Sequence, residues 1–161
     1  MLFSASFLNL PYFFIPFLSF VLGSDGNMAD LIKIPSSGTQ KSDLPPFLTM
    51  KGREVFKWAI NKVPEIILQG LKKVNLKLHE IDFFIIHQAN KRIIDAIAHR
   101  LHIPDEKVLS NIIEFGNTSA ASIPILLSQN VNKGKIKKGD KVLLVGFGSG
   151  LSWGLTIIEW S

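Results

Sequence analysis

The chain contains no cysteine among its 161 residues. Disulfide bonds and thiolate metal ligands are therefore excluded, and so is a cysteine nucleophile supplied by this chain. A metal site built from other residues is not expected either. His99 and His102 lie three positions apart on an expected helix, but no further ligands complete a convincing set around them.

Acidic residues are outnumbered, with 13 Asp and Glu against 18 Lys and Arg and a formal net charge of +5. The lysines are scattered along the sequence, so an ordinary solvated surface accounts for them as well as a binding function does. A nucleic-acid interface is not expected, because basic residues do not cluster with aromatic ones and no known motif of that class is present. The excess positive charge instead favours an acidic protein or a phosphate-bearing ligand as partner.

Charged side chains are absent from residues 1–24, which are rich in Phe, Leu and Ile. The segment lacks the basic start and the small-residue cleavage site of a secretory signal. Its length would span a bilayer, but Pro11 and Pro16 would interrupt a helix, and no Lys or Arg follows before Lys33 to orient it. We therefore favour a buried or poorly folded segment, with membrane attachment as the alternative.

The composition as a whole, 47% hydrophobic and 19% charged, is that of a globular chain of one domain. Apolar residues at helical spacing predict three helices, over residues 50–74, over 88–101 and from Ser119 onwards. Short apolar runs predict four strands, over residues 81–87, 108–115, 141–147 and 151–160. Strands that alternate with helices predict an α/β layered domain, in which the last two strands pair antiparallel.

Proline and glycine mark the breaks between these elements. Residues 31–46 contain Pro35, Gly38 and Pro45, which predict a loop. Pro64 is expected to kink the first helix or to open a second one.

Two polar residues follow predicted elements in a way that suggests a site. His87 ends the apolar run 81–86, and Asn117 follows Gly116 in a serine-rich turn. A histidine and an asparagine can together polarise a carbonyl group. The alternatives are a core histidine bonded to a backbone carbonyl, a turn-forming Asn117, and, for Asn90, a hydrogen bond at a helix start. The pattern predicts half of an active site, without its nucleophile.

Several motifs, in this order, closely resemble the C-terminal half of beta-ketoacyl-acyl-carrier-protein synthase III, a member of the thiolase-like superfamily. They are LGSDG at 22–26, MKGREVFK at 50–57, HQANKR at 87–92, GNTSAAS at 116–122 and GFGSGLSWG at 146–154. The resemblance divides the chain into an apolar segment outside the family, residues 1–18, and a C-terminal synthase domain, residues 19–161.

The resemblance implies an α/β fold, namely the C-terminal half of the thiolase-like fold, with a mixed sheet layered with helices. It implies an acyltransferase that initiates fatty-acid biosynthesis, condensing acyl-CoA, usually acetyl-CoA, with malonyl-acyl-carrier protein to give 3-oxoacyl-acyl-carrier protein. The substrates are then a coenzyme A thioester and a phosphopantetheine-linked carrier protein, and no cofactor is bound permanently. Such an enzyme works in the bacterial cytoplasm or the plastid stroma.

The resemblance also assigns roles to individual residues. His87 and Asn117 match the two non-cysteine members of a Cys-His-Asn triad. Positions that line the pantetheine tunnel or form the glycine-rich loop near the nucleophile correspond to Asn90, Gly52, Phe56, Gly148, Ser149 and Gly150. Some family members have glycine where Ser149 stands. Arg92 and Lys57 match positions implicated in docking the acyl-carrier protein.

The N-terminal half of the family, with its cysteine and much of the dimer contact, has no counterpart here, and residues 1–18 do not resemble it. We expect an alternative or out-of-frame start in a split reading frame to explain both facts. The expected partners are a missing N-terminal half or a homodimer partner, because a lone half exposes an apolar patch and is expected to be poorly soluble. The alternative is a non-catalytic fragment that binds acyl-carrier protein or pairs with a complementary or full-length partner.

Overall fold

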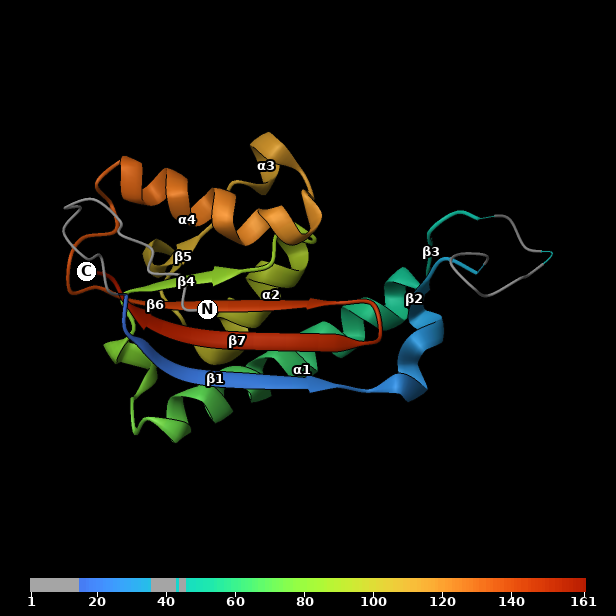
Figure 1. Cartoon of the computed structure of the whole chain (residues 1–161), viewed down its shortest axis with the longest axis horizontal. Coiled ribbons are helices and arrows are strands. Elements are labelled where there is room, and N and C mark those ends of the chain that lie inside the picture. The colour runs from blue at the N-terminus through green and yellow to red at the C-terminus, as the bar shows by residue number, and fades with distance from the viewer. Residues whose placement is uncertain (1–14, 36–42, 44–45) are drawn as a thin grey trace, which may run out of the picture.

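A five-stranded sheet forms the centre of the molecule (Figure 1). The structure is a computed structural model that describes residues 15–35, 43 and 46–161. The strand order is β1-β7-β6-β4-β5. The strands are β1 (Phe17–Ser24), β4 (Phe83–Ile86), β5 (Val108–Leu109), β6 (Lys141–Gly148) and β7 (Ser152–Glu159). A separate small ribbon pairs β2 (Ile32–Lys33) with β3 (Thr49–Met50).

The sheet is mixed, as expected from the sequence. β4 runs parallel to both β5 and β6, whereas β7 runs antiparallel to β6 and to β1. The predicted antiparallel pairing of the last two strands is therefore confirmed, with Val142 opposite Ile158 and Gly148 opposite Ser152.

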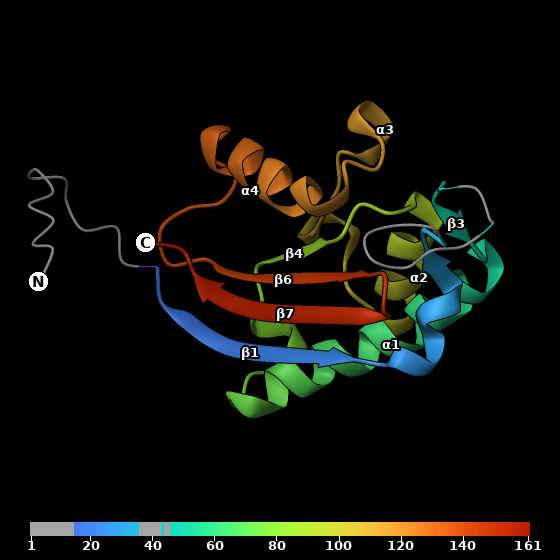
Figure 2. The same ribbon diagram turned by 45° about the vertical axis from the view of Figure 1, so that its right-hand side comes forward.

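Helices cover the sheet on both sides (Figure 2). The α-helices are α1 (Gly52–Lys73), α2 (Lys91–Leu101), α3 (Ile112–Phe115) and α4 (Ser122–Asn132). Four short 3₁₀ turns lie in the connections between helices and strands: η1 (Gly26–Leu31), η2 (Leu78–Glu80), η3 (Asp105–Lys107) and η4 (Ser119–Ala121). α1 packs against β1, β7, β6 and α2, while α4 packs against β4 from the opposite side. The result is the predicted α/β layering.

The long helix α1 follows directly from its apolar stripe. Val55, Ala59 and Val63 recur at helical spacing and are buried against the sheet. Pro64 is buried inside this one helix, so no second helix begins there. Gly70 lets the helix approach β7, because a Cβ at this position would overlap the side chain of Leu155.

Alternating residues of β4 fill two cores. Phe84 and Ile86 are fully buried in the cluster shared with α1 and α2, and Ile85 is fully buried in the cluster shared with α4. A strand buried on both faces reads as a continuous apolar run, which is why the sequence predicted it well.

The strand predicted over residues 108–115 is wrong in its second half. Only Val108 and Leu109 pair with β4, and the short helix α3 follows. The apolar residues after Asn111 do not continue the sheet, and Ile113 remains 84% exposed. Likewise α2 begins at Lys91 and not at Gln88, because Asn90 caps it. The predicted loop 31–46 includes β2, while its residues 36–42 and 44–45 lie outside the described part.

Among the described residues, no helix covers the sheet face opposite α1 over β1 and β7, and this is called the open sheet face. Phe20 and Leu22 of β1 are 51% and 80% exposed on it. They border a shallow apolar hollow of about 550 Å³ together with Leu144, Gly154 and Thr156. Of the predicted apolar segment 1–18, residues 1–14 lie outside the described part, and β1 begins at Phe17. No helix in the described ranges is long and apolar enough to cross a bilayer.

Candidate active site

His87 stands directly after β4, at the carboxyl end of a parallel strand. Its backbone N–H continues the ladder to the carbonyl of Val145 at 2.9 Å. Its ring lies with Nδ1 2.7 Å from the hydroxyl oxygen of Ser122 and packs edge-on against Phe147, with ring centroids 5.5 Å apart. Burial lowers the pKa of His87 below its ordinary value, because desolvation penalises the charged imidazolium. The site therefore favours a neutral imidazole.

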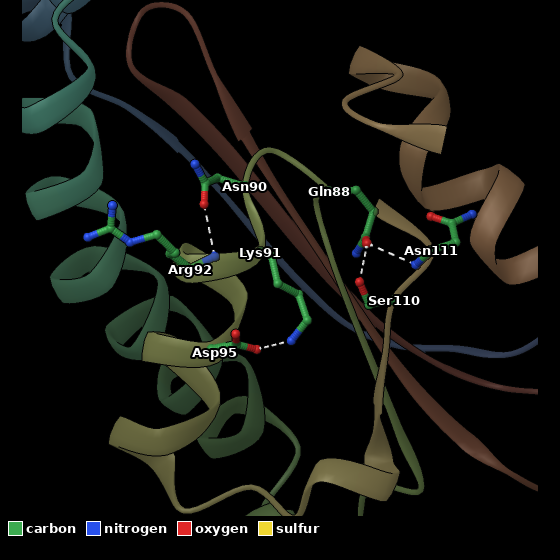
Figure 3. Close-up of polar contacts among 7 residues, drawn as sticks. All are labelled: Gln88, Asn90, Lys91, Arg92, Asp95, Ser110 and Asn111. Carbon is green, nitrogen blue, oxygen red and sulfur yellow. Dashed lines mark hydrogen bonds and ion pairs between the residues drawn. The ribbon is translucent and has the colours of Figure 1, made fainter. Parts of the chain in front are cut away.

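Gln88 anchors the segment that follows His87. Its side chain is fully buried, and its amide nitrogen donates to the carbonyl of Ile86 at 2.7 Å. Its amide oxygen accepts bonds from the hydroxyl of Ser110 at 2.8 Å and the backbone N–H of Asn111 at 3.2 Å (Figure 3). This network ties the end of β4 to the end of β5 and ends the pairing of the two strands.

Asn90 starts α2, which is the alternative that the sequence left open for it. Its side-chain oxygen accepts a bond from the backbone N–H of Arg92 at 2.8 Å (Figure 3). Lys91 pairs with Asp95 one turn further along the same helix. With the side-chain oxygen of Asn90 engaged, its amide nitrogen is the group left to meet a ligand.

Asn117 lies in a turn whose backbone conformation depends on the glycine before it, Gly116. Gly116 has φ 65° and ψ −158°, a backbone region that residues with a Cβ rarely adopt. The side-chain oxygen of Asn117 accepts a bond from the backbone N–H of Ser119 at 2.9 Å. As at Asn90, this bond engages the amide oxygen and leaves the NH₂ group without a hydrogen-bond partner among the described residues.

A cavity of about 590 Å³ joins most of the residues singled out from the sequence. It lies between the start of α1, the start of α2 and the turn that carries Asn117. Six of the predicted residues line it: Gly52, Phe56, Lys57, Asn90, Arg92 and Asn117. Three sequence segments thus converge, and Met50 of β3, next to the start of α1, also contributes to the wall.

The predicted glycine-rich loop and His87 are not part of this lining. Ser149 is exposed, and its hydroxyl donates to the carbonyl of Ile32 at 2.6 Å, so it contacts β2. Phe147 lies between the glycine-rich loop and His87, because it precedes the loop near the end of β6 and its ring packs against that of His87.

Sequence reasoning missed two kinds of residue around the site. Ser122 meets the histidine and Gln88 anchors the segment after it, but no role in the site was predicted for either residue from the sequence. The only available signal was that both lie within the motifs that hold His87 and Asn117. Trp58 and Trp153, whose rings lie 5.8 Å apart, were also missed, because nothing in their spacing links α1 to β7.

Two other hollows are larger, but Lys57 is the only residue among those predicted for the site that lines either of them. One of about 780 Å³ lies beside η1 and α1, and one of about 700 Å³ lies beside α2 with His99 and His102 on its wall. Within the described ranges no three His, Cys, Asp or Glu side chains come together in a way that could hold a metal ion.

Comparison with known proteins places the chain in a family. Residues 71–160, more than half of the chain, match the model of the C-terminal region of 3-oxoacyl-acyl-carrier-protein synthase III. The chain belongs to the 3-oxoacyl-acyl-carrier-protein synthase III family. The matched region begins near the end of α1 and includes His87, Asn117 and the hairpin β6–β7.

Individual members of the synthase III family agree with this. The beta-ketoacyl-acyl-carrier-protein synthase III of Acaryochloris marina is 44% identical over 153 residues, which are 89% of this chain and 46% of the relative. That of Synechocystis sp. is 55% identical over 113 residues, 70% of this chain and 34% of the relative. The solved synthase III of Thermus thermophilus matches 90% of this chain and 46% of its own, with a TM-score of 0.84 and 42% identity.

The fold is therefore the thiolase-like fold expected from the sequence, and the chain forms the C-terminal part of it. The chain spans about half the length of the curated relatives that it matches.

Proposed function

We propose that this chain is the His/Asn half of an initiating condensing enzyme that joins acyl-CoA, usually acetyl-CoA, to malonyl-acyl-carrier protein. The observation that carries the proposal is the cavity at the starts of α1 and α2, because residues from separate motifs line it together. The domain that does this work is proposed to be residues 19–161, acting in a bacterial cytoplasm or a plastid stroma.

In this reaction a malonyl thioester loses carbon dioxide and leaves an enolate, whose negative charge develops on the thioester oxygen. The ring of His87 and the amide NH₂ of Asn117 are proposed to donate hydrogen bonds to that oxygen. The neutral state that burial favours for His87 suits this role, since a neutral imidazole still carries one ring N–H that can donate a hydrogen bond. The enolate carbon then attacks an acyl thioester, forms the new carbon–carbon bond and expels the thiolate.

The entrance of the cavity fits a carrier protein and its phosphopantetheine arm. Arg92 and Lys57 are exposed at its rim and provide positive charge for an acidic partner. Asn90, Gly52 and Phe56 line the same cavity, and an elongated arm is proposed to lie against them. The Gly148–Gly150 loop is proposed to present a backbone N–H to the acyl oxygen.

The acyl-carrying thiolate must come from a partner segment outside these 161 residues, because they contain no cysteine. We infer that this partner packs on the open sheet face, where Phe20 and Leu22 are exposed. Apolar side chains gathered on one face typically mark an interface. A complementary N-terminal half satisfies the need for a thiolate, and a homodimer partner of full length would satisfy it as well.

Complementation tests this proposal. The chain is co-expressed with the cysteine-bearing N-terminal part of the Acaryochloris marina synthase, and the complex is assayed for carbon dioxide release and product from malonyl-acyl-carrier protein. His87→Ala and Asn117→Ala are each expected to lower turnover about 100- to 1000-fold, the usual effect of losing one oxyanion donor. His99→Ala, an exposed histidine of α2, is the matched control and should retain turnover. Full activity of His87→Ala would contradict the assignment.

A non-catalytic carrier-binding fragment is the second candidate, and the missing cysteine favours it. Calorimetry of the chain with holo-acyl-carrier protein separates the two. Arg92→Ala and Lys57→Ala are expected to weaken binding by about 2- to 5-fold each, as exposed charge pairs do, whereas Lys137→Ala on the turn before β6 should not. Binding without product in the complemented assay would favour this candidate.

A further inference from the structure

Ser122 is a buried hydroxyl in contact with His87. It opens α4, and only 1% of its surface is exposed. Its oxygen lies 2.7 Å from Nδ1 of His87 and accepts a hydrogen bond from the backbone N–H of Gln88 at 3.3 Å. A single side chain thus links the GNTSAAS segment to the two residues that follow β4.

The bonding pattern determines where the protons are. A hydroxyl has one proton to donate, and the N–H of Gln88 can only donate, so it takes up a lone pair of the oxygen. Among the described residues, Nδ1 of His87 is the other hydrogen-bond partner of the Ser122 hydroxyl. If Nδ1 also carried a proton, all three groups would be donors, and a buried hydroxyl proton would have no acceptor. The hydroxyl must therefore donate to an unprotonated Nδ1.

We propose that Ser122 is a positioning residue that holds His87 in the tautomer with its proton on Nε2. The proposal rests on the proposed function, in which His87 must present a ring N–H to a developing oxyanion. The bond made by one ring nitrogen sets the protonation of the other. Phe147 packs edge-on against the same ring and restricts its rotation. The donor is then oriented before substrate arrives, which is the condition for preorganised stabilisation of charge.

Solid-state ¹⁵N NMR of the histidine-labelled chain at neutral pH tests this, because it reads ring protonation in soluble and associated protein alike. The His87→Gln variant identifies the His87 signals. In the wild-type chain we expect Nε2 protonated and Nδ1 unprotonated but hydrogen-bonded. In Ser122→Ala the Nδ1 resonance should move to that of a nitrogen without a hydrogen bond, and Ser122→Thr should retain the wild-type position. Ser128→Ala, exposed on the same helix, is the matched control.

A protonated Nδ1 in the wild-type chain would overturn the proposal, and so would an unchanged Nδ1 resonance in Ser122→Ala. The tautomer of His87 is read from the wild-type chain without the Ser122 variants, so a Ser122→Ala chain that failed to fold would still leave a protonated Nδ1 able to overturn the proposal. None of these signals depends on turnover. The expected tautomer in a complemented enzyme that does not decarboxylate malonyl-acyl-carrier protein would contradict the proposed function and leave the role of Ser122 intact.

Discussion

The guanidinium carbon of Arg92 lies 5.6 Å from the centre of the Phe56 ring. The arginine comes from the first turn of α2 and the phenylalanine from the second turn of α1, and both line the same cavity. A cation above an aromatic face is attracted by the ring quadrupole. This contact therefore stabilises the packing of the start of α2 against the start of α1, at the rim where a carrier protein is proposed to dock.

A double-mutant cycle measures that contact. Phe56→Leu keeps an apolar side chain but removes the ring, and Arg92→Ala removes the cation. The coupling free energy between the two substitutions is expected to be about 0.5–1 kcal/mol, as for exposed cation–π pairs. Urea unfolding at one fixed protein concentration provides the four free energies of unfolding, and strictly additive effects would show that the contact contributes nothing.

The partly buried ring of His87 predicts a specific dependence of stability on pH. Desolvation holds the pKa of His87 in the folded chain below the ordinary value of 6.5. As pH falls, the unfolded chain therefore takes up the proton before the folded chain does. Above pH 6.5 the titration of His87 does not change the free energy of unfolding. As pH falls from 6.5 through the folded pKa, the titration lowers this free energy progressively. His87→Gln should reduce this loss of stability. An NMR titration, with His87 assigned by the same variant, should give a midpoint below 6.5, and a higher midpoint would contradict the desolvation argument.

The sequence predicted those elements in which burial alone decides structure. α1, β4 and the β6–β7 hairpin have unbroken apolar patterns, and each forms close to its predicted bounds. The strand predicted over residues 108–115 failed because local patterning does not reveal the hydrogen bonds that Gln88 makes to Ser110 and Asn111. Whether a residue is buried can be predicted from the sequence pattern, whereas a hydrogen-bond partner 22 or 23 positions away cannot.

The candidate site shows the same division. Motif resemblance alone selected Gly52, Phe56, Asn90 and Arg92, because no periodic pattern distinguishes a cavity wall from any other surface. The two amides could not be oriented from sequence, since their directions depend on backbone N–H groups that are placed only by folding. The contact of Ser122 with His87 was hidden for a similar reason, because the residues are 35 positions apart.

Removing the buried amide of Gln88 is expected to destabilise the chain. Gln88→Ala leaves the carbonyl of Ile86 without this donor and the N–H of Asn111 without its acceptor, and a buried unpaired group costs about 1–3 kcal/mol. The expected loss for the two groups together is therefore roughly 2–6 kcal/mol in the free energy of unfolding. Gln69→Ala, on the exposed side of α1, is the matched control and should change stability by less than about 0.5 kcal/mol. Equal effects of the two substitutions would mean that the network has no energetic role.

The open sheet face predicts that the isolated chain associates with itself. Phe20 and Leu22 are exposed beside an apolar hollow, and covering such a surface removes it from water at about 25 cal/mol per Å². Leu22→Lys places a charge beside the hollow of that face and should shift the sedimentation profile toward the monomer. Ile113→Lys is the matched control, because Ile113 is 84% exposed but lies on α3, away from the face. Adding the cysteine-bearing half of a relative should have the same effect as Leu22→Lys on self-association, since both partners would compete for one surface. A wild-type chain that sediments as a single monomer at all concentrations would show that this face needs no partner.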